Sequence, residues 1–179
     1  FDAGYYNRDI LVQFWNISLN QYVSVIDKFF AAWTCLFVSI PQKALSDFWT
    51  ECVYKTKSFP LAALNFLCQV RSRATTLSIK SEVASTLWNA MQNLPSTSED
   101  GKIEYVNALS FYTTPNTSQW SEIKAKCFEY ISLGQNVAFA VSLLSRIWCN
   151  YNTETTQKEF DLLLCLGRTY NNNNLNTTM

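Results

Sequence analysis

The sequence predicts an all-α protein made of two tandem, related helical-bundle repeats that pack together and are stapled by disulfide bonds. Three observations lead to this prediction: apolar residues recur at helical spacing, a cysteine block occurs twice, and glycine and proline number only four each. So few turn-forming residues disfavour a β-sandwich, which needs many tight turns. An apolar content of 48% in 179 residues is enough for a substantial core.

The repeated cysteine block defines the predicted duplication. Residues 52–71 begin Cys-Val-Tyr-Lys-Thr and end Leu-Cys-Gln-Val-Arg, and residues 149–168 begin Cys-Asn-Tyr-Asn-Thr and end Leu-Cys-Leu-Gly-Arg. Upstream of both blocks come a glycosylation sequon, a first cysteine and a helix-breaking step, at Pro41 and at Gly134. We therefore predict one repeat over 1–100 and a shorter one over 101–179. The alternative is chance similarity between two cysteine-containing helical stretches.

Apolar residues at helical spacing predict the elements of each repeat. In the first repeat the expected helices cover residues near 10–15, then 21–38, 42–54, the stretch after Pro60, and 78–94. In the second they cover 103–112, 118–131, 136–150 and 160–165, followed by a polar, Asn-rich tail over 170–179. The 136–150 helix is apolar on nearly all sides, which predicts a central position. The tail stands where the first repeat has its last helix, so we expect an uncovered apolar groove there.

The cysteines are predicted to form disulfide bonds rather than a metal site. No close CxxC pair and no histidine is present, as the usual zinc sites would require. Helix geometry places the cysteines of each repeated block at similar heights in an antiparallel hairpin. Of the fifteen possible connectivities we prefer the one in which the blocks close internally and the remaining pair joins the repeats: Cys52–Cys68, Cys149–Cys165 and Cys35–Cys127.

A secreted, extracellular glycoprotein is the predicted setting. Disulfide bonds require an oxidising compartment, and three sequons begin at Asn16, Asn116 and Asn176. The chain begins with Phe1, which fits a removed signal peptide as well as a trimmed chain. The longest apolar run, residues 29–40, is shorter than the roughly 20 residues of a transmembrane helix. We therefore expect no membrane span.

Several classes of function are disfavoured by the composition. Fourteen basic residues balance fourteen acidic ones, whereas nucleic-acid binding proteins carry a basic excess. The absence of histidine excludes a Ser-His-Asp triad and the HExxH metal site, and no phosphate-binding glycine motif is present. The acidic pairs Glu99/Asp100 and Glu154/Glu159 fit solvated surface charge better than a glycosidase site. We expect no enzyme, no metal and no cofactor.

Two kinds of recurring side chain are candidates for a binding site. Arg71 and Arg168 follow the second cysteine of each block, where they could clamp a carboxylate or cap a helix C-terminus, and the second interpretation is simpler. The large aromatic residues could line a cavity or a partner surface, although core packing is the simpler explanation. The aromatic candidates are Phe29, Phe30, Trp33, Phe37, Trp49, Trp88, Phe139 and Trp148.

A non-catalytic role through protein–protein contacts is the function that the sequence favours. Such a module would act at a surface, bind a receptor or assemble with itself, and the duplication would give it two similar faces. The alternative is an extracellular carrier of a small apolar ligand or lipid, held in an internal pocket lined by the aromatic residues. A closed cavity would favour the carrier, and an exposed groove would favour the module.

Overall fold

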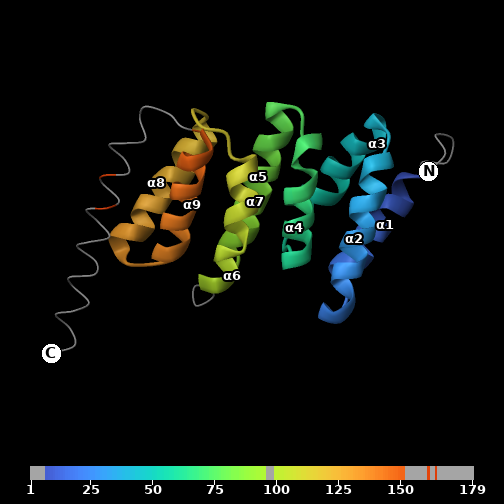
Figure 1. The fold of residues 1–179 in the computed structure, drawn as a ribbon, viewed down its shortest axis with the longest axis horizontal. Helices are drawn as coiled ribbons and strands as arrows, with labels where there is room; N and C mark the ends of the chain where they lie inside the picture. The colour runs from blue at the N-terminus through green and yellow to red at the C-terminus, as the bar shows by residue number, and fades with distance from the viewer. Residues whose placement is uncertain (1–6, 96–98, 152–160, 162–163, 165–179) are drawn as a thin grey trace.

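The structure, a computed structural model, describes residues 7–95, 99–151, 161 and 164. Every regular element within these residues is a helix, which confirms the all-α class (Figure 1). No helix among them is both long enough and apolar enough to cross a membrane. The helices are α1 Arg8–Leu19, α2 Val23–Ser39, α3 Gln42–Asp47, η1 Phe48–Val53, α4 Leu61–Val70, η2 Arg71–Arg73, α5 Leu77–Gln92, α6 Glu99–Ile103, α7 Tyr105–Tyr112, α8 Ser118–Leu133 and α9 Val137–Tyr151.

The helix ends follow ordinary capping chemistry. The side chain of Asn7 accepts hydrogen bonds from the amides of Asp9 and Ile10 at the start of α1. The hydroxyls of Thr76 and Thr117 play the same part for α5 and α8. Helix α8 ends at Gly134, whose φ of 66° is the left-handed conformation that glycine adopts without a steric cost. The predicted helix break at this position is therefore present.

The expected 42–54 helix changes character halfway along. Its first part is the α-helix α3, and its second part is the six-residue π-helix η1. Four of the six residues of η1 are buried, namely Phe48, Trp49, Cys52 and Val53. A π-helix is wider than an α-helix and is rare outside short stretches, so sequence periodicity alone could not predict it.

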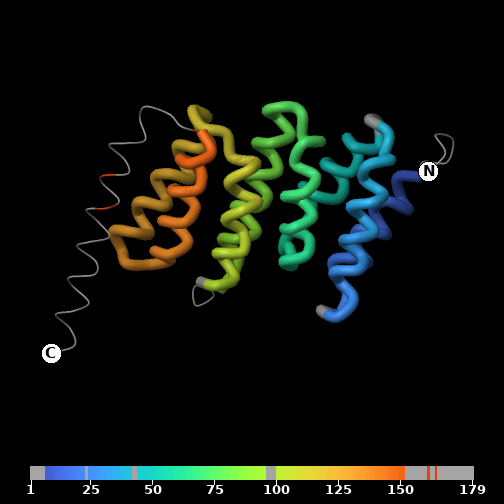
Figure 2. Tube along the Cα trace, viewed as in Figure 1, coloured from blue at the N-terminus to red at the C-terminus, as the bar shows by residue number. Residues whose placement is uncertain are grey.

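The helices form two layers that run the length of the molecule (Figures 1 and 2). In the first layer, which we call the α2 layer, α2 packs on α4, α4 on α7, and α7 on α9. In the second, the α1 layer, α1 packs on η1 and η1 on α5. Hydrogen bonds from Gln119 and Tyr130 of α8 to Ser81 and Gln92 of α5 continue the α1 layer. Successive antiparallel hairpins are therefore stacked side by side, as in α-solenoid proteins.

One continuous apolar core fills the space between the layers. It runs from Leu11 in α1 to Trp148 in α9 without interruption. Between α1, α2 and η1 the core is aromatic. Trp15 meets the rings of Phe30, Trp33 and Phe48, with ring centroids 5.6, 5.5 and 5.2 Å apart. Helix α9 stands in the last described hairpin rather than at the centre, which is occupied by α4, α5 and α7 (Figure 1).

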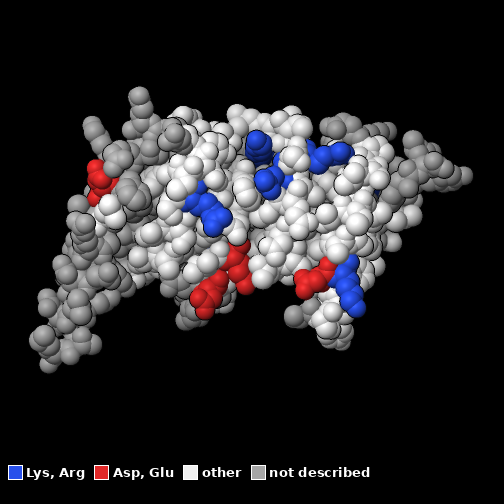
Figure 3. Space-filling model, in the orientation of Figure 1, with Lys and Arg blue, Asp and Glu red and all other residues white. Residues whose placement is uncertain are grey.

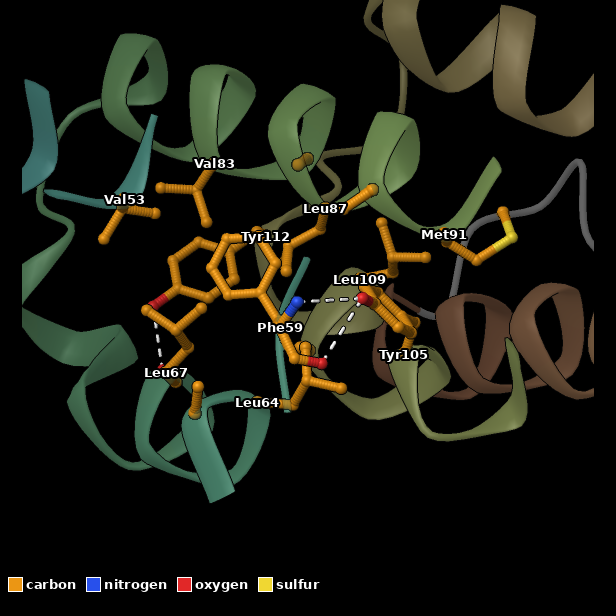
Figure 4. Close-up of a cluster of buried hydrophobic side chains, with 14 of the residues drawn as sticks. Val53, Phe59, Leu64, Leu67, Val83, Leu87, Met91, Tyr105, Leu109 and Tyr112 are labelled. Atoms are coloured by element: carbon orange, nitrogen blue, oxygen red, sulfur yellow. Dashed lines mark hydrogen bonds between the residues drawn. The ribbon is translucent and has the colours of Figure 1, made fainter. Parts of the chain in front are cut away.

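A buried hydrogen bond in the middle of the core joins helices α7 and α4. The hydroxyl of Tyr112 in α7 donates to the carbonyl oxygen of Leu67 in α4 over 2.8 Å (Figure 4). Both residues are buried, so the hydrogen bond satisfies groups that water does not reach. It fixes the register of α4 against α7, the pair around which the outer hairpins are stacked.

The predicted disulfide staples are wrong. Cys35, Cys52, Cys68, Cys127 and Cys149 are all free thiols, and Cys165 lies outside the described residues. Equal height along two helices does not bring two cysteines together unless both point to the shared face. Cys52 instead lines a groove against α1, whereas Cys68 lies near Arg71, Arg146 and Tyr112.

Buried Cys52 and Cys127 and half-buried Cys68 act as small apolar side chains in or against this core. Removal from water raises the pKa of Cys52 and of Cys127 to about 12, and that of Cys68 to about 11. A thiol with so high a pKa stays protonated at neutral pH and is a poor nucleophile. Their packing therefore explains these three cysteines without a covalent bond.

The duplication over 1–100 and 101–179 stays a prediction. The structure places several matched positions in different settings: Asn16 lies within α1, whereas Asn116 lies in a turn with a φ of 65°. Cys52 belongs to η1 in the α1 layer, and Cys149 belongs to α9 in the α2 layer. Of the helix expected over 160–165, the structure describes only residues 161 and 164, both of them helical, and the Asn-rich tail and the predicted apolar groove beside it lie outside the described residues.

Thiol labelling tests the unpaired cysteines. Without any reductant, iodoacetamide is expected to modify exposed Cys35 and Cys149 in the native protein, and to reach buried Cys52 and Cys127 only after denaturation. Peptide mapping by mass spectrometry gives the labelled positions, and the native sample is the control for the denatured one. A peptide pair linked through Cys52 and Cys68 would contradict the structure.

Candidate functional site

The α1 layer carries two adjoining grooves, one on each side of the loop 54–60. The first has a volume of about 560 Å³ and lies between α1, η1 and the loop. The second, of about 440 Å³, lies between the loop and α5. Both are lined by Lys55, Thr56 and Lys57, so they form one surface that we call the loop groove. Its other main polar side chains are Asn16, Asn20, Glu51, Ser58, Thr86, Asn89 and Asn93.

The start of the loop is fixed to α1 by a buried hydrogen-bond chain. The indole Nε1 of Trp15 donates to the hydroxyl of Thr56 over 2.9 Å, and this hydroxyl donates to the carbonyl oxygen of Cys52 over 2.8 Å. The backbone amide of Thr56 donates to Val53 as well, at 3.1 Å. Trp15 and Thr56 are both buried, so the indole N–H of Trp15 depends on the Thr56 hydroxyl for its acceptor.

The end of the loop is fixed to α7. Phe59 is buried, and its backbone amide donates to the hydroxyl of Tyr105 over 3.2 Å. The same hydroxyl donates back to the carbonyl oxygen of Phe59 over 3.4 Å (Figure 4). A segment between two buried anchors has little conformational freedom left, so the exposed residues Lys57 and Ser58 project from a fixed backbone.

The charged side chains of the loop groove differ in whether they have an ion-pair partner. The carboxylate of Glu51 accepts hydrogen bonds first from Arg8 and then from Lys55, which lower its pKa to about 2. Glu51 is therefore ionised at neutral pH and neutralised by two bases. Lys57 is exposed, and it forms no ion pair with any residue that the structure describes.

Four asparagines flank the loop and give the groove its hydrogen-bonding capacity. Asn16 and Asn20 lie in the groove wall at the end of α1, and Asn89 and Asn93 lie across the loop at the end of α5. A side-chain amide offers donors and an acceptor in one plane, which matches a peptide group or a carboxylate. The side-chain amide of Asn20 already donates to the backbone carbonyl oxygen of Asn16 over 2.7 Å, so the Asn20 side chain is held in position.

The aromatic residues singled out in the sequence lie mainly in the core. Phe30, Trp33, Phe37, Trp49, Phe139 and Trp148 are buried, and Phe29 and Trp88 are half-buried. They pack ring against ring, with centroids 5.9 Å apart for Phe37 and Trp49 and 6.1 Å apart for Trp88 and Phe139. A wholly apolar hollow between α1 and α2 has a volume of only about 150 Å³.

Arg71 takes the helix-end role. Its Nη1 donates to the carbonyl oxygen of Cys68 over 2.7 Å, and its guanidinium lies 4.3 Å above the ring of Phe111. Both contacts are typical of an arginine at a helix C-terminus. Its predicted counterpart, Arg168, lies outside the described residues.

Charge on the face drawn in Figure 3 also follows the helix ends. Most basic side chains gather toward the upper middle of this face and most acidic ones along its lower edge, with exceptions at the lower right and the upper left. The α2-layer helices begin at the lower edge and end at the upper one (Figure 2). Helix dipoles favour this arrangement of the two signs, so helix stability alone explains it.

The two sequons within the described residues each have a structural role. In the first, Ser18 is buried, and its hydroxyl accepts from the indole of Trp33 over 2.9 Å and donates to the carbonyl oxygen of Phe14 over 2.7 Å. In the second, Asn116 adopts a positive φ that asparagine tolerates better than most residues, and Thr117 caps α8. Asn176 lies outside the described residues.

The acidic pairs considered in the sequence do not assemble a site in the described part of the chain. Asp100 is exposed, and Glu154 and Glu159 lie outside the described residues. Within those residues, no group of three or more cysteine, aspartate or glutamate side chains is arranged to hold a metal ion. The loop groove could not be predicted from the sequence, because Lys57 and Asn89 belong to no recognisable motif.

Removing the Thr56 hydroxyl tests the anchor of the loop. Thr56→Val keeps the shape of the side chain but leaves the Trp15 indole without an acceptor, so we expect a loss of about 1–3 kcal/mol in the free energy of unfolding. Urea denaturation followed by tryptophan fluorescence measures the change. The control is Thr50→Val, whose exposed hydroxyl bonds only to backbone oxygens of the preceding turn, at Ser46 and Asp47, and which should shift stability by less than about 0.5 kcal/mol. Equal effects of the two variants would contradict the anchor.

Comparison with known proteins does not assign the chain to a family. No protein-family model, no curated protein and no solved structure matches the chain.

Proposed function

We propose that the chain is a non-catalytic protein-binding module that holds an extended segment of a partner protein in the loop groove. The observation that supports this function most directly is the loop 54–60, which is anchored by buried hydrogen bonds at both ends and open on both sides. A binding surface fixed before the partner arrives loses less conformational entropy on binding than a mobile one.

The lining of the groove fits a polypeptide. Each residue of an extended chain presents one backbone donor and one acceptor, and these groups need partners once they are removed from water. The amides of Asn16, Asn20, Asn89 and Asn93 supply both kinds of partner on the two sides of the loop. Stacked helical hairpins commonly bind partners along such extended surfaces.

The carrier of an apolar ligand has less support. Pockets for small molecules usually have volumes of about 300–1,000 Å³ and mostly apolar walls. The apolar hollow beside Phe14 and Trp33 is smaller than this range, and the first, larger part of the loop groove is open and mainly polar. A groove of about 360 Å³ between α2 and α4 lies within the range, but it is open to solvent rather than enclosed. The aromatic residues expected to line a chamber pack against one another instead.

Secretion stays a prediction that rests on the sequons. With the cysteines unpaired, the argument from disulfide bonds no longer applies. Asn116 is exposed in a turn, so a glycan there would not disturb the fold. Asn16 lines the loop groove, so a glycan there would cover the proposed binding surface.

Glycosylation therefore tests the compartment and the groove together. In a secreting eukaryotic host, we expect peptide-N-glycosidase to shift the protein on a denaturing gel, and Asn116→Gln combined with Asn176→Gln to abolish the shift because Asn16 stays unmodified. Asn107→Gln, at an exposed asparagine outside any sequon, is the control. A chain without glycan would contradict secretion by this route, and a glycan on Asn16 would contradict binding in the loop groove.

Blocking the groove tests the proposed function itself. Peptides selected from a random library displayed on phage would be synthesised with a fluorescent label and titrated by anisotropy. Asn89→Trp places a bulky ring in the second groove at an exposed position, and we expect at least a roughly tenfold loss of affinity, or about 1.4 kcal/mol. Asn107→Trp, at an exposed position of α7 outside the groove, should bind as the unmodified protein does.

Peptides that bind both tryptophan variants equally well would show that the binding surface is elsewhere. Thermal unfolding of the two variants, followed by circular dichroism, separates a blocked groove from a damaged fold.

A further inference from the structure

We infer that the segment held in the loop groove is acidic, with an Asp or Glu side chain that pairs with Lys57. The inference rests on the proposed function and adds the chemistry of the partner. It follows from which charges line the groove, which of them are already paired, and where the unpaired one stands.

The charged side chains that line the groove are Glu51, Lys55 and Lys57. Glu51 is paired with Lys55 and, on its other side, with Arg8. Two bases thus share this carboxylate, and Asp47 and Asp9 also lie close enough to Arg8 to raise its pKa. Glu51 therefore adds little repulsion toward an incoming carboxylate.

Lys57 is the remaining lining charge, and its position makes it available to a partner. It lies between buried Thr56 and buried Phe59, the two anchored residues of the loop, and its own side chain is exposed. Both grooves include Lys57 in their walls, so it stands on the ridge between them. An extended segment that crosses from one groove to the other must pass this ammonium group.

Glu82, a carboxylate on α5, does not pair with Lys57. Glu82 lies on α5 close enough to Tyr54 to contribute to the raised pKa of that phenol, although burial is the larger cause. Glu82 lines neither groove and forms no ion pair with Lys57. A basic segment would be repelled by Lys57, whereas an acidic one would find complementary charge there.

Charge reversal with rescue tests the inference. Peptides selected from the random phage library against the unmodified protein are expected to be enriched in Asp and Glu. Lys57→Glu should weaken their binding by about tenfold, because an attraction becomes a repulsion, and exchanging the peptide's acidic residue for lysine should restore it. Lys28→Glu is the matched control, since Lys28 is an exposed lysine of α2 that lines neither groove.

The outcomes separate the two proposals. Selected peptides that lose affinity with Asn89→Trp but show no acidic enrichment and no response to Lys57→Glu would overturn the acidic partner and leave the binding module intact. Peptides that ignore Asn89→Trp would overturn the groove itself. Because Lys57 is exposed, its reversal should leave the thermal unfolding midpoint unchanged, and Lys57→Ala provides a second, milder variant.

Discussion

The hydrogen bond from the Trp15 indole to the Thr56 hydroxyl joins the core to the candidate site. Trp15 is surrounded edge-on by the rings of Phe30, Trp33 and Phe48, so its position is fixed by the first two hairpins. Its one polar atom needs a buried acceptor, and the loop supplies it. The position of the loop groove is therefore determined by aromatic packing on its inner side.

The stacked architecture explains why a groove forms at this loop. Each hairpin buries its apolar face against its neighbours, so neighbouring hairpins must stay in register. Loop 54–60 connects η1 to α4 and therefore crosses from the α1 layer to the α2 layer. Phe59 turns into the core and meets Tyr105, while Lys57 stays outside. This short loop thus packs against α1 and α7 on its inner side and contributes exposed side chains to the molecular surface.

The sequence predicted the helices and most of the core, because helical periodicity reports burial directly. It could not predict the cysteine pairing, since spacing gives the height of Cys52 and Cys68 along their helices but not the direction in which they point. The loop groove depends on partners that are 41 residues apart for Trp15 and Thr56, and 46 apart for Phe59 and Tyr105. A buried donor in the sequence requires an acceptor but does not specify which one.

The sequons illustrate a second limit of sequence reasoning. Asparagine, serine and threonine mark glycosylation sites, and they are also the residues that cap helices and occupy tight turns. Thr117 caps α8, Asn116 takes a left-handed turn, and Ser18 satisfies the Trp33 indole, so helix packing accounts for these residues without a glycan. Asn16 is the exception, because its exposed side chain has no capping or turn role and faces the loop groove. Of the two described sequon asparagines, it is therefore the one whose side chain lines the proposed binding surface.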